Sequence, residues 1–272
     1  MPKSRINGVR LYWELTGDRG PTLVLVHGSW GDHRNWDAVV SGLAASFHVL
    51  TYDRRGHGQS ERLNEQGSIE QDADDLAGIL RESGLGPAHV VGSSFGASVV
   101  LRAALRHRDV FSSLAVHEPP LHRLLPPGDP GAAAIQERIA AVVATLERGD
   151  SVGGARQFVE TVAFGPGMWE RLPARMRETF VFNATTFLDE VKEPAAFTIP
   201  LPQLAAFDRP ALLTQGSESP PFFGQVLDLI AGAMAGVQRY TFDHAGHAPH
   251  VTNPGEYVPV IAEFAQRSAV AG

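Results

Sequence analysis

The chain has 272 residues, of which 43% are hydrophobic and 19% charged, a composition typical of a globular protein with a substantial core. Its formal net charge of −7 argues against a nucleic acid or an anionic membrane as partner, because either would require a basic surface. The absence of cysteine excludes disulfides, a cysteine nucleophile and thiolate metal sites. The N-terminal residues lack the apolar stretch of a signal peptide, and no run approaches the roughly 18 apolar residues of a membrane span, so we expect a cytoplasmic protein.

The first 120 residues alternate between predicted strands and helices. Asn7-Gly8 indicates a hairpin turn, and Val9–Leu15 then alternate in polarity as an edge strand does. Thr22–Val26 is continuously apolar, which is typical of a strand covered on both faces. Further predicted elements are a helix over Arg34–Ala45, a strand over Phe47–Tyr52, an amphipathic helix over Ile69–Ser83, a helix from Ala97 to about His107 and a strand over Leu114–Val116. This alternation predicts an α/β fold with a mainly parallel, doubly wound sheet.

The alternation stops after Pro120 and returns near residue 211. Between these points the sequence predicts helices and no strand, over Ala132–Glu147, Val152–Phe164 and Leu172–Glu190. Segments rich in proline bracket this block at residues 124–131 and 197–202. The later elements are a strand over Ala211–Thr214, a helix over Phe222–Met234, a strand over Val237–Phe242 and a helix over Glu256–Ala269. We therefore expect a core domain of residues 1–120 and 203–272, with a helical cap of residues 121–202 inserted into it.

A strand, a tight turn and a helix meet at residues 87–97, where the turn reads G-S-S-F-G over residues 92–96. This G-x-S-x-G pattern is typical of a nucleophile elbow, whose turn is so sharp that only glycine fits two positions before and after the serine. The bend leaves the serine Oγ exposed at the edge of the sheet, and the next backbone N–H points into the same space. Ser94 is therefore the candidate nucleophile, and the N–H of Phe95 is a candidate oxyanion donor.

Five landmarks in order give the chain a resemblance to the α/β-hydrolase superfamily over nearly its whole length. They are the His27-Gly28 turn, the D-R-R-G-H-G-Q-S segment at residues 53–60, the elbow at residues 92–96, the helical insertion and Gly246-His247. The resemblance implies an α/β-hydrolase fold, a nucleophile–acid–histidine order along the chain and an active site roofed by the cap. It does not imply one reaction, because this fold hosts many.

A serine hydroxyl needs a neighbouring base, and His247 is the candidate that the sequence favours among eleven histidines. It follows a predicted strand whose carboxyl end lies at the same sheet edge as the elbow. Gly246 beside it lets the loop bend the imidazole toward Ser94. His250 is the runner-up for the base, although its position favours a wall of the substrate pocket.

The acid that orients this histidine is not where the superfamily usually carries it. That position, a few residues after the strand that follows the cap, holds Ser219. Two alternatives remain: Glu118, at the end of the strand after the elbow helix, and Glu218, one residue from the usual position. We favour Glu118 because its strand neighbours the elbow strand. The zearalenone-lactonase group also has a similar His-Glu-x-Pro run at this point of the chain.

The oxyanion hole needs a second donor, which we expect from the turn after the first buried strand. The N–H of Ser29 occupies this turn, and Gly28 before it allows the backbone to approach closely. The pocket walls are expected from aromatic side chains beside this turn and in the cap and from the C-terminal loop, the candidates being Trp30, Trp169, Phe187 and His250. For Trp30, a place in the core is an equal alternative.

These residues together predict a carboxylesterase or lactonase that cleaves a moderately apolar small molecule through an acyl-enzyme. The same serine and histidine also serve a C–C bond hydrolase or a cofactor-free perhydrolase, and a small-ligand receptor on a hydrolase scaffold is an alternative from a different class. No motif for a metal or organic cofactor is visible, so we expect none. The expected partner is the small-molecule substrate, and the oligomeric state stays open, a homodimer being one alternative.

Overall fold

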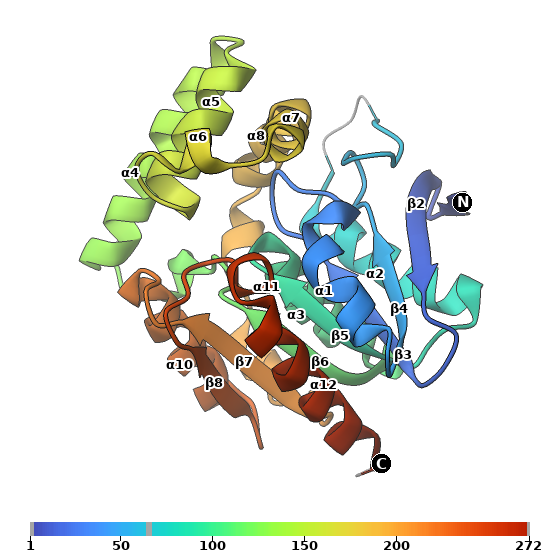
Figure 1. Cartoon of the computed structure of the whole chain (residues 1–272). Coiled ribbons are helices and arrows are strands. Elements are labelled where there is room, and N and C mark those ends of the chain that lie inside the picture. The colour runs from blue at the N-terminus through green and yellow to red at the C-terminus, as the bar shows by residue number, and fades with distance from the viewer. Residues whose placement is uncertain (1–2, 64–66, 271–272) are drawn as a thin grey trace.

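The computed structural model describes residues 3–63 and 67–270 and contains an eight-stranded sheet in the order β1-β2-β4-β3-β5-β6-β7-β8 (Figure 1). β1 and β2 are antiparallel to their neighbours, and the other six strands are parallel. The α/β fold with a mainly parallel sheet is therefore confirmed. The strands are β1 (Lys3–Ile6), β2 (Val9–Thr16), β3 (Thr22–Val26), β4 (His48–Tyr52), β5 (Ala88–Ser93), β6 (Phe111–His117), β7 (Ala211–Gly216) and β8 (Gln238–Phe242).

The helices that accompany the sheet begin and end close to the predicted limits. The helix over Ile69–Ser83 has the predicted bounds, because Ser68 caps its first turn and Gly84, at φ 69°, ends it. The predicted Arg34–Ala45 helix starts instead as a short 3₁₀ turn capped by Asp32. The helices of the core are α1 (Asp37–Leu43), α2 (Ile69–Ser83), α3 (Phe95–Arg106), α10 (Pro221–Ala233), α11 (Pro249–Thr252) and α12 (Pro254–Val270).

Helices bury both faces of the sheet, which explains why its central strands are apolar throughout. On one face, α1 and α12 share a hydrophobic cluster with the strands, through residues such as Leu43 and Phe264. On the other face, α2, α3 and α10 share a second cluster, through residues such as Leu76, Val100 and Leu227. Parallel strands covered in this way end together at one edge, where ligand sites of open α/β sheets lie.

The residues between β6 and β7 form helices that Figure 1 shows gathered at one end of the sheet. A third hydrophobic cluster joins them to Trp30, in the turn after β3, so the insertion lies over the carboxyl end of that strand. Its helices are α4 (Pro130–Glu147), α5 (Ser151–Phe158), α6 (Met168–Arg171), α7 (Ala174–Phe182), α8 (Ala184–Lys192) and α9 (Leu201–Leu204).

Two helices of this insertion differ from the sequence-based expectation. The predicted helix over Val152–Phe164 ends as α5 at Phe158 and continues as a π-helical turn over Val159–Ala163. The predicted helix over Leu172–Glu190 is divided into α7 and α8 at Asn183, whose side chain bonds to the main chain of another segment. Among the described residues, no helix combines the length and the apolar character that crossing a membrane requires.

Candidate active site

Ser94 lies at the apex of the sharp turn between β5 and α3. Its backbone adopts φ 56° and ψ −126°, a strained conformation for a non-glycine residue. A Cβ atom on Gly92 would lie 2.5 Å from the carbonyl oxygen of Gly96, and a Cβ on Gly96 would overlap the carbonyl oxygen of Val26. The two glycines therefore permit the turn, and the serine side chain stays half-buried at the edge of the sheet.

The turn after β3 packs directly against this serine. A Cβ atom on Gly28 would lie 2.9 Å from the Cβ of Ser94, so glycine is needed for the close approach. His27 holds the turn: its Nε2 accepts from the N–H of Arg54 at 3.0 Å, which leaves Nδ1–H to donate to the carbonyl oxygen of Gly28 at 2.8 Å. Phe95 is the first residue of α3, so the helix offers no acceptor for its N–H.

Glu118 and His247 come together from distant parts of the chain. Glu118 follows β6, and one of its carboxylate oxygens accepts from Nδ1–H of His247 at 2.6 Å. Its other oxygen accepts from the N–H of Gly216 at 2.7 Å, at the end of the adjacent strand β7. The ring of Phe223 stacks on the imidazole of His247, with 4.8 Å between ring centroids. These contacts fix the ring and leave Nε2 of His247 as the basic nitrogen.

The surroundings of Glu118 keep its carboxyl group ionised. Burial alone would raise the pKa of Glu118, but His117, whose Nε2 lies 3.6 Å from the carboxylate, and the hydrogen bond from His247 lower it to about 2. Burial in turn lowers the pKa of His117 to about 4, so that ring is neutral near pH 7 and becomes charged only in the acid range where Glu118 would take up its proton. A buried carboxylate with these partners can orient an imidazole and stabilise its protonated form.

The alternative acid and the usual acid position both lie on the loop after β7. Glu218 is exposed to solvent, and its backbone N–H donates to the carbonyl oxygen of Ala245. Ser219 is half-buried and carries no charge. The geometry thus favours Glu118 over Glu218 as the partner of His247.

Ser94, His247 and Ser29 line one cavity of about 50 Å³ between the sheet edge and the insertion. Its other walls are largely aromatic or aliphatic and come from both parts of the chain: Trp36, Phe158, Ala163, Phe164, Met176, Phe180, Ala248, His250 and Val251. A cavity of this size and lining accommodates a short apolar group or a few water molecules.

Of the four residues expected to form the pocket, the structure places one at this cavity. His250 lines it and packs against Trp36 in a tilted arrangement, with 4.5 Å between ring centroids. Trp30, Trp169 and Phe187 lie instead within the third hydrophobic cluster, where Trp30 packs on Phe187 and on other rings of the insertion. Trp30, whose backbone has φ 67°, is fully buried in that cluster. Sequence spacing identifies such residues as buried but not the cavity that they face.

Backbone strain is concentrated around this site. Five described non-glycine residues have positive φ, and four of them follow the carboxyl ends of β3, β5, β6 and β8: Trp30, Ser94, Glu118 and His244. Each such conformation costs on the order of 1–3 kcal/mol and persists only where the surrounding structure imposes it. The sequence contains no signal for this strain at Trp30 or Glu118.

Within the described part of the chain, two clusters have donor atoms near enough to hold a metal ion, His117–Glu118–His247 and Asp32–His33–Asp53. In the first, both oxygens of Glu118 already accept hydrogen bonds. In the second, one oxygen of Asp53 accepts from the backbone and the ring of His33, and the other accepts from the N–H of Gln59. Both donor sets therefore fit internal hydrogen bonding better than metal coordination.

Burial lowers the pKa of six described histidines, His27, His57, His89, His117, His122 and His250, which makes the fold sensitive to acid. Burial lowers the pKa of His27 and His117 to about 4 and that of His250 to about 3. The unfolded chain takes up these protons near pH 6.5, so it binds more protons than the folded chain as the pH falls from 6.5 toward 4. We expect the free energy of unfolding to fall over this window by up to about 1.4 kcal/mol per pH unit for each histidine.

Urea denaturation between pH 7.5 and 4.5 measures this slope. His250→Phe keeps the ring on Trp36 and should flatten the dependence by about one histidine's share, whereas His244→Asn, at an exposed position, should leave it unchanged. If the pH dependence of the free energy of unfolding is the same in His250→Phe as in the wild type, His250 does not contribute to the acid sensitivity.

The sequence model of the alpha/beta hydrolase fold family matches residues 21–254. The chain therefore belongs to the α/β-hydrolase fold family, and the resemblance inferred from its sequence motifs is confirmed.

The sequence relatives differ in how much of this chain they match. The uncharacterized hydrolase YraK of Bacillus subtilis is 37% identical over 123 residues, which make up 44% of this chain and 45% of that protein. The matches to the first curated relatives thus span less than half of their length. The pimeloyl-(acyl-carrier protein) methyl ester esterase of Vibrio atlanticus is 26% identical, with 94% of this chain and 98% of that protein covered.

Solved structures share the fold over nearly the full chain. The enol-lactonase from Burkholderia xenovorans LB400 superposes with a TM-score of 0.81 at 23% identity, covering 97% of this chain and all of that one. An alpha/beta hydrolase from Sphaerobacter thermophilus superposes with a TM-score of 0.75 at 27% identity, covering 97% and 98%.

Proposed function

We propose that this protein is a serine hydrolase that cleaves a carboxylic ester or lactone of a small, moderately apolar molecule. The observation that carries the proposal is the hydrogen bond between the buried, ionised carboxylate of Glu118 and Nδ1 of His247. The imidazole of His247 lines the same cavity as Ser94. A buried carboxylate that orients an imidazole in this way serves to activate a hydroxyl as a nucleophile. The relatives named as an esterase and an enol-lactonase support the same class of substrate.

In the proposed first step, Oγ of Ser94 bonds to the carbonyl carbon while its proton passes to Nε2 of His247. The N–H groups of Ser29 and Phe95 donate to the oxygen that becomes negative. The bond from the carbonyl carbon to the leaving oxygen then breaks, and that oxygen takes the proton from His247. An ester releases its alcohol at this point, whereas a lactone opens and keeps its hydroxyl attached to the acyl group.

In the second step, water replaces the serine. His247 takes a proton from the water as its oxygen bonds to the acyl carbon, and it then returns the proton to Oγ of Ser94 as the acyl bond breaks. Glu118 stays ionised throughout and stabilises the protonated imidazole. This proposal requires no metal or organic cofactor.

We also propose that residues 121–202 act as a cap over residues 1–120 and 203–272. Phe158, Phe164 and Phe180 of the insertion form one side of the cavity, and Trp36 and His250 form the other. The cavity of about 50 Å³ favours a short acyl group next to Ser94.

A panel of substrates tests this function. We expect steady turnover of p-nitrophenyl acetate and of a small aliphatic lactone, with p-nitrophenyl esters of long acids cleaved at least about tenfold more slowly because the cavity is small. A single stoichiometric release of p-nitrophenol without turnover would support a ligand receptor instead. Turnover of a vinylogous diketone in preference to every ester and lactone would support the C–C bond hydrolase.

A further inference from the structure

Glu190, on helix α8 of the insertion, contacts the turn that follows β3. It is 7% exposed, and one of its carboxylate oxygens accepts from the hydroxyl of Ser29 at 2.5 Å. The residue that is proposed to donate its N–H to the oxyanion is therefore tied through its side chain to the insertion. The hydroxyl of Ser29 is engaged in this bond, which separates the role of its side chain from that of its backbone.

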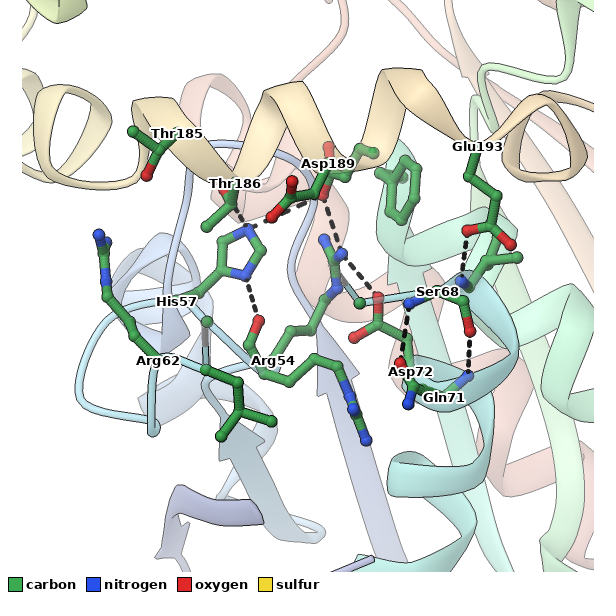
Figure 2. Close-up of a pocket in the computed structure, with 17 residues that line it drawn as sticks. Arg54, His57, Arg62, Ser68, Gln71, Asp72, Thr185, Thr186, Asp189 and Glu193 are labelled. Atoms are coloured by element: carbon green, nitrogen blue, oxygen red, sulfur yellow. Dashed lines mark hydrogen bonds and ion pairs between the residues drawn. The ribbon is translucent and has the colours of Figure 1, made fainter. Parts of the chain in front are cut away.

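The other oxygen of Glu190 is bound by Arg54, whose guanidinium lies against Phe95. It accepts from Nη2 of Arg54 at 2.8 Å, and the same guanidinium nitrogen donates to Asp72 at 2.9 Å. Figure 2 shows Arg54 beneath α8, with its guanidinium between that helix and Asp72. The guanidinium carbon lies 4.5 Å from the centre of the ring of Phe95, the residue after the nucleophile. One carboxylate thus contacts Ser29 directly and Phe95 through Arg54.

The turn itself depends on outside support. Trp30 has φ 67°, which a tryptophan adopts only where its surroundings impose it. Asn183, between α7 and α8, donates through Nδ2 to the carbonyl oxygens of Trp30 and Gly31 at 3.1 and 2.8 Å. The insertion therefore holds three successive residues of the turn, and Glu190 holds Ser29, which lines the same cavity as Ser94.

Stability alone does not explain an ionic network in this place. Taking Arg54, Asp72 and Glu190 out of water carries a desolvation cost of several kcal/mol per ion, and apolar side chains of similar size often give a more stable protein. Their hydrogen bonds are directional, however, and fix positions that apolar packing leaves adjustable. An oxyanion hole requires such fixed positions, because its donors must point at the place where charge develops.

We propose that Glu190 is a positioning residue that orients the N–H groups of Ser29 and Phe95 toward the oxyanion, an inference that rests on the function proposed above. It touches no substrate. Its contribution appears only when the carbonyl oxygen becomes negative, so its loss should lower kcat and leave KM nearly unchanged.

The test compares a ligand that forms an oxyanion with one that does not. Phenylboronic acid bonds to the serine oxygen and becomes a tetrahedral anion, whereas the KM for p-nitrophenyl acetate stays unchanged when acylation and deacylation slow by the same factor. Glu190→Gln retains one acceptor where the carboxylate had two. We expect kcat to fall by about 10- to 100-fold, and the boronate to bind more weakly by a similar factor, with KM changed less than about threefold.

Two further comparisons distinguish positioning from general support. Glu193→Gln, at the end of the same helix, removes a charge from a side chain that bonds to the N–H of Ile69 and should leave boronate binding unchanged. Ser29→Ala should reproduce the effect of Glu190→Gln, and Ser29→Thr, which retains a hydroxyl, should restore most of the boronate affinity. If Glu190→Gln fails to fold, the boronate affinities of Ser29→Ala and Ser29→Thr test the proposal instead.

The results that overturn the proposal are specific. Unchanged boronate affinity in folded Glu190→Gln or in Ser29→Ala refutes it. So does a loss in which boronate affinity and 1/KM fall by the same factor, because that indicates a general distortion of the pocket. If the wild-type protein does not bind the boronate, or Ser94→Ala binds it equally well, the proposed function itself fails and the role of Glu190 falls with it.

Discussion

Replacing Ser94 with alanine is expected to lower kcat/KM for p-nitrophenyl acetate by about 10⁴- to 10⁶-fold, because no other group can form the acyl bond. The side chain caps no helix and is half-buried, so its removal should change the free energy of unfolding by less than about 1 kcal/mol. Steady-state kinetics and urea denaturation of the same preparation measure both quantities. Full activity in a pure variant would refute the assignment of the nucleophile.

A second substitution at this position separates activity from backbone strain. Ser94→Gly should be as inactive as Ser94→Ala, yet more stable than it, because glycine adopts φ 56° without a steric penalty. The gain should be on the order of 1 kcal/mol, reduced by the extra freedom that glycine gives the unfolded chain. Equal stability of the two variants would show that the turn stores little strain.

Replacing Glu118 with glutamine is expected to lower kcat/KM by about 10³- to 10⁴-fold. The amide NH₂ can donate to Nδ1 of His247, which would place the ring proton on Nε2 and prevent that nitrogen from accepting the proton of Ser94. The carboxylate would also be lost as the partner of the protonated ring. Glu218→Gln serves as the matched control and should change kcat/KM less than about twofold, because Glu218 is exposed.

Moving the acid to the usual position of the family tests whether His247 can be oriented by a carboxylate at residue 219 in place of Glu118. Ser219 lies on the loop that begins at Gly216, whose N–H is 2.7 Å from the carboxylate of Glu118. Adding Ser219→Asp to Glu118→Ala should therefore recover at least about tenfold in kcat/KM over Glu118→Ala alone. Recovery would show that His247 requires a nearby acid rather than residue 118 itself. A loss in Glu218→Gln equal to that in Glu118→Gln would instead identify Glu218 as the acid.

The parts of this molecule that could be predicted from sequence are those governed by local rules. Alternating apolar segments predicted the sheet, and the helix over Ile69–Ser83 was predicted with its bounds because its caps are local. The elbow pattern placed Ser94 between a strand and a helix, as the structure has it. Glu118 and His247 could be paired because parallel strands end together at one edge.

The remaining features depend on contacts between distant segments. For Trp30 the sequence left a pocket wall and a core position open, and the structure buries it in the hydrophobic cluster that it shares with the insertion. Glu190 gives no sequence signal, since an acid in a helix is usually solvated and its importance arises from burial against Ser29 and Arg54. The break at Asn183 has the same origin, because its side chain forms hydrogen bonds with the turn after β3.

The most direct measurement of the proposed chemistry is the mass of the protein during turnover. The wild-type chain is mixed with p-nitrophenyl acetate, quenched in acid within the first turnover and digested. We expect one acetyl group on the peptide that contains Ser94, appearing with the burst of p-nitrophenol and disappearing when substrate is exhausted. Two results would contradict the account. In the first, the ester is hydrolysed and the acetyl group that accounts for the turnover lies on another residue. In the second, the wild type forms no adduct and Ser94→Ala keeps full activity.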